Sequence, residues 1–132
     1  MSDKPAAKQG DTVVGTDIHV LMIPSPGGPV PTPTPMPFNG VLLQELSADV
    51  EICNMKAATV GSKAKNNPPH LPTVGPFQKP PLDEGTIQMG SRKVQINGKD
   101  AARVGDPALT CNDPADAPNG TVVGGGSVFF GG

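Results

Sequence analysis

Residues 94–106 read VQINGKDAARVGD, and a similar pattern, VEICNMKAATVGS, aligns with them without a gap at residues 50–62. A third copy is split between the two ends of the chain: it starts as VFFGG at residues 128–132 and finishes as KPAAKQGD at residues 4–11. A chain whose termini share one repeat is expected to close on itself. Three equivalent units around one axis predict a pseudo-threefold object, and therefore a partner with threefold symmetry.

The length of 132 residues predicts a single domain spanning residues 1–132. A formal net charge of −2 argues against a nucleic-acid-binding protein. Glycine and proline, 17 of each, approach the content of disordered or fibrous chains, but the ordered repeat favours a folded one. With no Trp or Tyr and only four Phe, the core must be small, so closure, oligomerisation or a metal ion has to add stability.

Three repeat units are predicted, at residues 40–62, 85–106, and 120–132 joined with 4–11. Each has a short strand after a glycine, a second alternating strand, a tight turn and a pair of alanines. Asn97-Gly98 is typical of a type I′ turn, and Cys53-Asn54 and Gly131-Gly132 stand at the equivalent places. Small side chains repeated three times after the turns suggest a close approach to a shared axis.

Between the units run three proline-rich segments, residues 12–39, 63–84 and 107–119, which are predicted to be irregular. Seven prolines fall between Pro24 and Pro37, and proline has no N–H donor, so this stretch is predicted to be polyproline II or extended coil rather than helix or central strand. A flexible linker or a ligand for a proline-binding module is the alternative. Because the segments connect units that face the same way, they are expected to converge at one end.

Each of these segments carries one good metal ligand: His19, His70 and Cys111. The two histidines each follow a repeat glycine by nine residues, and the cysteine follows one by six. Nitrogen and sulfur donors meeting on the axis are typical of zinc. Hydrogen-bonded loop histidines and a small buried cysteine are the alternatives. Cys53 stands at the other end of its unit, so it is interpreted as structural, and a disulfide with Cys111 is disfavoured.

The alanine pairs in their context, PAAK at residues 5–8, KAAT at 56–59 and DAAR at 100–103, give the chain a family resemblance. Together with INGK at residues 96–99 and the Gly-Asp that closes two of the repeats, they resemble the PAAR-repeat proteins over essentially the whole chain. The proline-rich first segment is similar to that of the PAAR-like branch found with contractile injection systems. No triplet is a perfect PAAR.

The resemblance implies an all-β fold: a small pseudo-threefold cone of three short β-hairpin repeats with Pro/Gly-rich connecting loops and a metal near the apex. It also implies one structural zinc ion per chain, held in the family by three histidines and one cysteine. His19, His70 and Cys111 match ligand positions, but no third histidine is present. The family pattern expects it near Met36, so a water, Asp113 or another group is expected to complete the site.

The function implied by the resemblance is that of a non-enzymatic spike tip. As a monomer on a trimer, it would cap and sharpen the β-helical, valine-glycine-repeat spike of a type VI secretion system or related phage-tail-like particle, and aid puncture of a target membrane. Assembly in the bacterial cytoplasm and delivery outside the cell are expected. The alternative is an adaptor that recruits effector cargo through residues 20–39 and 63–84. A zinc hydrolase is disfavoured, because no Glu or His is placed as a general base near the ligands.

Overall fold

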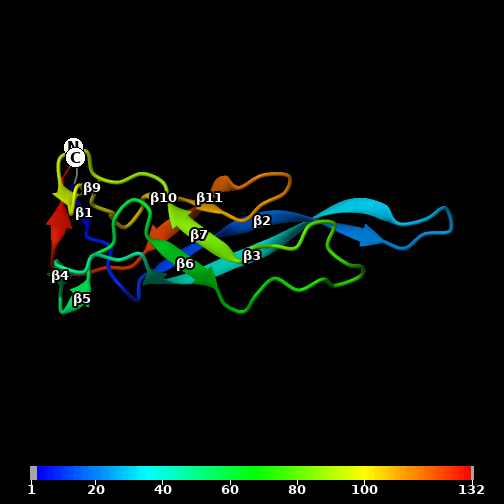
Figure 1. Cartoon of the computed structure of the whole chain (residues 1–132), viewed down its shortest axis with the longest axis horizontal. Coiled ribbons are helices and arrows are strands. Elements are labelled where there is room, and N and C mark those ends of the chain that lie inside the picture. The colour runs from blue at the N-terminus through cyan, green and yellow to red at the C-terminus, as the bar shows by residue number, and fades with distance from the viewer. Residues whose placement is uncertain (1–2, 132) are drawn as a thin grey trace.

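The chain is built from β-strands alone, as predicted. The structure is a computed structural model that describes residues 3–131. Among these residues there is no helix, and so none that could cross a membrane. The molecule is elongated, with its first and last strands paired at one extremity and a long hairpin at the other (Figure 1). The strands are β1 (Lys4–Pro5), β2 (Thr12–Ile23), β3 (Val30–Gln44), β4 (Glu51–Ile52), β5 (Met55–Lys56), β6 (Lys63–Asn66), β7 (Glu84–Ile87), β8 (Gln95–Ile96), β9 (Lys99–Asp100), β10 (Pro107–Thr110), β11 (Ala117–Val123) and β12 (Phe129–Phe130).

Six of the strands close into an antiparallel barrel in the order β10-β11-β2-β3-β6-β7. The predicted first strands of the three units lie in it, as the end of β3 and as β7 and β11. Phe38, Leu42, Ile87 and Val122 fill the interior and are almost completely buried. Closure leaves no unpaired edge where the six strands meet, which helps a chain with so few large apolar side chains to stay folded.

Three two-stranded sheets form the end of the molecule that holds the termini, which we call the base. Two are the hairpins β4–β5 and β8–β9, and the third pairs β1 with β12 from the two ends of the chain. They confirm the predicted second strands and the repeat split between the chain ends. Asn97 and Gly98 both have positive φ, at 54° and 78°, as a type I′ turn requires. Cys53 and Asn54 do the same, at 53° and 65°. The equivalent Gly131-Gly132 turn includes Gly132, which lies outside the described residues.

The alanine pairs meet around the axis above the base and are joined by a ring of backbone hydrogen bonds. Ala7 N–H donates to Ala102 O, Ala102 N–H to Ala58 O, and Ala58 N–H to Ala7 O, each at 3.0 Å. All three alanines are fully buried. Three further backbone hydrogen bonds link the same units in a second ring. Gln9 N–H donates to Lys56 O, Val60 N–H to Asp100 O, and Val104 N–H to Pro5 O. The predicted close approach to a shared axis is therefore confirmed.

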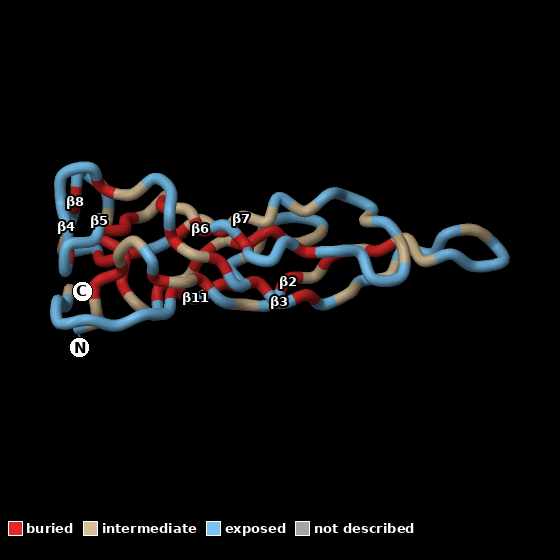
Figure 2. Tube along the Cα trace, turned by 90° about the horizontal axis from the view of Figure 1, so that it is seen from below, coloured by how far each residue is buried: buried red, intermediate tan, exposed pale blue. Residues whose placement is uncertain are grey.

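The prediction for the proline-rich segment at residues 24–37 was wrong in one respect. Most of it belongs to β3, which pairs with β2 without interruption from Thr12 opposite Val41 to Ile23 opposite Val30. Beyond the barrel the two strands continue as a long hairpin, which Figure 2 shows to be largely exposed at its far end. The segments 63–84 and 107–119 also contain the strands β6, β10 and the start of β11, while residues 67–83 form no strand.

The spacing of the prolines explains how β3 accommodates them. Pro31, Pro33, Pro35 and Pro37 occupy every second position, and all four are exposed. In a strand, alternate residues direct their N–H groups to opposite sides. The nitrogens that lack a hydrogen therefore all lie on the edge away from β2, where proline is tolerated. The residues between them keep their donors for the pairing with β2, so the free edge of the hairpin is also protected from joining another strand.

The buried ring of alanines generates a prediction for stability. Ala58→Leu places three extra carbon atoms in a fully packed axis, and overpacking of this kind costs about 1–3 kcal/mol or more. Chemical denaturation should show a correspondingly lower free energy of unfolding. Ala48→Leu is the matched control, because Ala48 is exposed in the same repeat unit and should tolerate the change. Equal unfolding free energies for the two variants would contradict the axial packing.

Candidate metal centre

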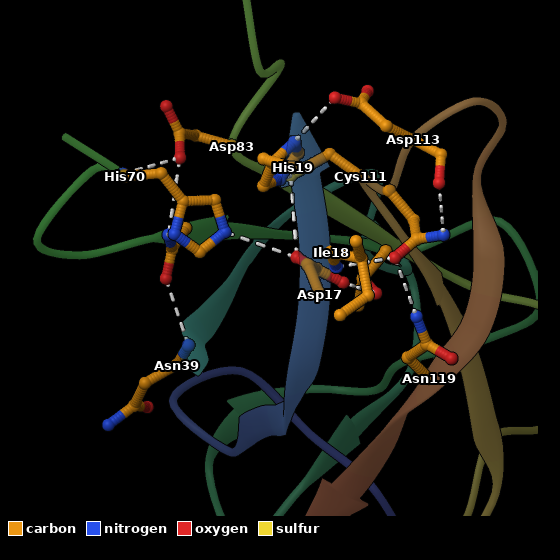
Figure 3. Close-up of polar contacts among 12 residues, drawn as sticks. Asp17, Ile18, His19, Asn39, His70, Asp83, Cys111, Asp113 and Asn119 are labelled. Atoms are coloured by element: carbon orange, nitrogen blue, oxygen red, sulfur yellow. Dashed lines mark hydrogen bonds and ion pairs between the residues drawn. The ribbon is translucent and has the colours of Figure 1, made fainter. Parts of the chain in front are cut away.

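Four side chains from three parts of the chain meet in the interior beyond the barrel core (Figure 3). Asp17 and His19 lie two residues apart on β2 and so share one face of the strand. His70 comes from the loop after β6, and Cys111 directly follows β10. One potential ligand atom from each of the four lies within 4.8 Å of the others, and all four residues are buried. The structure therefore brings together the three residues singled out in the sequence and adds Asp17.

The separations suit a small tetrahedral ion. His70 Nε2 lies 3.1 Å from Asp17 Oδ2, and Cys111 Sγ lies 3.5 Å from the same oxygen and 3.7 Å from His19 Nε2. Bonds of about 2.0–2.3 Å from a tetrahedral zinc place its ligand atoms about 3.3–3.8 Å apart. The donor set of two imidazoles, one carboxylate and one thiol is also one that zinc accepts. The group could thus hold a metal ion.

The outer nitrogen of His70 and its backbone are fixed by two neighbours. Asn66 Nδ2 lies 3.3 Å from His70 Nδ1, and the Asp83 carboxylate accepts hydrogen bonds from His70 N–H at 2.9 Å and from Asn66 Nδ2 at 3.2 Å. Because an amide NH₂ group can only donate, His70 Nδ1 is the acceptor of this contact and the ring proton lies on Nε2, which faces Asp17 Oδ2. A metal ion bound at Nε2 would require that proton to move to Nδ1.

His19 is held differently. Its Nδ1 is buried and makes no hydrogen bond, and the nearest carboxylate oxygen, Asp113 Oδ2, is 3.6 Å away. Asp113 accepts instead from Val20 N–H at 2.9 Å. Asp113, one of the groups expected to complete the site, therefore stands behind His19 and not among the four.

Asp17 is the member of the group that the sequence reasoning missed. Its side chain is fully buried, and its second oxygen, Oδ1, accepts a short hydrogen bond from the Thr110 hydroxyl. The signal was the Asp-x-His spacing at residues 17–19, which places both side chains on one face only if the segment is a strand. Met36 lies opposite Asp17 in the β2–β3 register and is buried, so the position where the third histidine was expected does lie beside the group.

The two cysteines lie apart, as expected. Cys53 is free and exposed in the β4–β5 turn at the base, whereas Cys111 is free and buried in the group of four. Burial and then the negative charge of Asp17 raise the pKa of the Cys111 thiol from 9.0 to about 12. Without a metal the sulfur therefore keeps its proton at neutral pH, and a metal ion that binds as a thiolate complex must displace it.

The arrangement is typical of a structural site. Four protein ligands would complete a tetrahedral shell, whereas catalytic zinc sites keep one position open for water or substrate. The hollow beside His19 and Cys111 is only about 20 Å³. A metal here would join β2, the loop after β6 and the end of β10, which are the three segments that were predicted to converge.

Two comparisons with known proteins bear on the chain. The family model described as the PAAR motif matches residues 20–114, which is well over half of the sequence. His70 and Cys111 lie inside the match, and His19 immediately precedes it. A search of curated proteins finds none that matches the chain.

The fourth ligand can be tested by substitution. Asp17→Asn keeps the shape of the side chain but removes the charge and the strong oxygen ligand, so metal affinity should fall by about ten- to a hundredfold or more. Elemental analysis of the purified protein should give close to one metal ion per chain for the natural sequence and far less for the variant. Asp116→Asn, an exposed carboxylate of the same loop as Asp113, should retain the metal. Full metal content in Asp17→Asn would exclude the residue as a ligand.

The raised pKa of Cys111 predicts the pH dependence of metal binding. Above the range in which histidine side chains titrate, each bound ion should release one proton from this thiol. The apparent affinity for zinc, measured against a competing chelator, should therefore rise about tenfold per pH unit between about pH 8 and pH 9.5. In Cys111→Ala the affinity should be lower and nearly independent of pH. A flat profile for the natural protein would show that the sulfur does not bind as a thiolate.

Proposed function

Because the chain belongs to the PAAR-motif family, the spike-tip proteins of contractile injection systems, we propose that it caps and sharpens the trimeric central spike of such a machine. The observation that carries this proposal is the base, where three equivalent two-stranded sheets surround one axis. A threefold surface can make three similar contacts with three identical chains, so one tip suffices for one trimer.

The chemistry of the base supports docking by burial of apolar surface. Val50, Met55, Val128 and Phe129 are all exposed on its hairpins or directly before them, and Phe129 retains 53% of its accessible surface. These four side chains give the base apolar surface that a partner could bury. Glu51 and Gln95 stand at the positions equivalent to Phe129, so the three contacts are similar but not identical.

The opposite end has a composition that supports contact with a target membrane. Residues 18–44, which include the whole projecting hairpin loop, contain no Asp, Glu, Lys or Arg, and neither do residues 66–78. A charged side chain is expensive to move into a bilayer, and an unpaired N–H donor also costs free energy there. The proline edge of β3 presents fewer such donors, so the leading end of the molecule is suited to brief passage through a membrane.

We further propose that the group of four binds one zinc ion per chain and that the ion is structural. A site of this kind contributes on the order of 10 kcal/mol of folding free energy in small zinc domains. In a chain with so small a core, the zinc ion would stabilise the part of the molecule where residues 67–83 form no strand. Resistance to unfolding under force is what a spike tip requires. Assembly in the bacterial cytoplasm and export on the particle complete the proposal.

Recruitment of cargo is a second candidate, favoured by one observation. An open groove of about 460 Å³ runs beside the proline edge of β3 and is lined mainly by apolar groups of Pro35, Met36, Pro69 and Leu71. If an effector domain binds there, Leu71→Asp should abolish its co-purification with the tip. If the yield of that effector were unchanged, the groove would not be its binding site, and the proposal of a capping role would be unaffected.

Docking can be tested with the purified trimeric spike of the same particle. Mass photometry should show one tip per trimer, because the tip offers a single pseudo-threefold face. Phe129→Asp should weaken the complex by about tenfold or more, since it places a charge on the apolar base. Leu71→Asp is the matched control, an exposed apolar residue of the opposite half of the molecule. If Leu71→Asp lost binding and Phe129→Asp did not, the interface would lie at the opposite end of the molecule, and the proposal would be wrong.

A further inference from the structure

The residue that follows the alanine pair differs between the three repeat units, and in the unit at residues 40–62 its short side chain leaves a cavity. The residue after each alanine pair is Lys8, Thr59 or Arg103. In each unit its backbone N–H donates to the side chain three residues later, which is Asp11, Ser62 or Asp106. The backbone is therefore the same in all three units, and the side chains can be compared directly.

Two of the units fill this position with a cation. Arg103 pairs with both oxygens of Asp106, at 3.2 and 3.0 Å, and is buried. Lys8 Nζ donates to Asp11 Oδ1 at 3.2 Å and to Gly125 O at 2.7 Å. Gly125 belongs to the segment that connects the two strands of its own unit. The lysine thus spans the space between the alanine ring and that connecting segment.

The unit at residues 40–62 has no such side chain. Thr59 is too short to reach its connecting segment, residues 45–50, and the Ser62 hydroxyl donates to Glu45 O at 2.7 Å. Between Thr59 and this segment lies a cavity of about 200 Å³ that is open to solvent. A side chain of lysine or arginine fits a space of this size. The cavity is therefore the equivalent of the space that Lys8 fills in its own unit.

The groups that line this cavity suit a cation from outside. Glu45 and Asp49 are the acidic residues of its lining. Asp49 Oδ2 accepts from Asn97 Nδ2 at 2.7 Å, and the Ser47 hydroxyl donates to Asn97 Oδ1 at 2.5 Å. Lys99 on the wall offsets one of the two negative charges. Asn97 is also the first residue of the β8–β9 turn at the base, so the cavity adjoins the surface proposed to meet the spike.

We propose that this cavity binds one lysine or arginine side chain of the trimeric spike. The inference rests on the proposed capping function. Of the three equivalent chains of the spike, only one would place its cation there, because the other two units carry their own. The tip would then hold the trimer by three similar but not identical contacts and one polar contact that breaks the symmetry.

The cavity can be tested first with a small probe, methylguanidinium chloride, followed through backbone amide shifts in ¹⁵N NMR spectra. Saturable shifts are expected at residues 45–49, 59 and 97. Thr59→Arg, which fills the space with its own guanidinium, should abolish them, while Thr59→Val, which leaves the space open, should retain them. Glu45→Gln should weaken the probe about threefold to fivefold, and Glu51→Gln, on β4 outside the cavity, should not. Absence of shifts in the natural protein, or equal shifts in Thr59→Arg, would overturn the inference.

Affinity for the trimeric spike then separates this inference from the function on which it rests. Thr59→Arg should bind the spike about threefold to fivefold more weakly than the natural chain, and Thr59→Val should bind as the natural chain does. If Thr59→Arg binds with unchanged affinity, the cavity takes no part in docking, although capping stands. If the natural chain does not bind the spike at all, capping itself fails, and the inference with it.

Discussion

The fold depends on the ring of hydrogen bonds that joins Ala7, Ala58 and Ala102. Each alanine gives its N–H to one unit and its carbonyl to the other, so the ring exists only if all three units are present. One of these units is made from the two ends of the chain, through the pairing of β1 with β12. The constraint therefore couples the termini to the interior. It also explains the small side chains, because a larger one would separate the three backbones.

The two ends of the molecule are stabilised by different interactions. At the base, two rings of backbone hydrogen bonds join the three units, and a small apolar cluster that includes Ile52 and Ile96 packs beside them. Beyond the barrel, long loops cross beside β2, and Asp17, His19, His70 and Cys111 bring those loops together. A metal ion at this place would restrain residues 67–83, which form no strand. A closed repeat and a metal site would thus both compensate for the shortage of large apolar residues.

The repeat was enough to predict the hairpins, the turns, the alanine axis and three of the four grouped side chains, since each depends on local pattern repeated three times. The β2–β3 hairpin was not predicted, because proline usually excludes a strand. The prolines fit into β3 only because they occupy every second position, so that all the nitrogens without a hydrogen lie on the edge away from β2. Missing that strand also concealed Asp17, whose position beside His19 follows from strand periodicity. The roles of Asp113 and of the Thr59 cavity depend on contacts between distant segments, which no local pattern reports.

Native-state amide hydrogen exchange at the three axial alanines tests the closed ring most directly. Ring closure predicts that the amides of Ala7, Ala58 and Ala102 exchange with the same, highest opening free energy, close to that of global unfolding. Ala7 lies only a few residues from the chain end, where amides ordinarily exchange early through fraying. Fast exchange at Ala7, with Ala58 and Ala102 still protected, would show that the terminal unit opens by itself and that the ring does not hold the fold together.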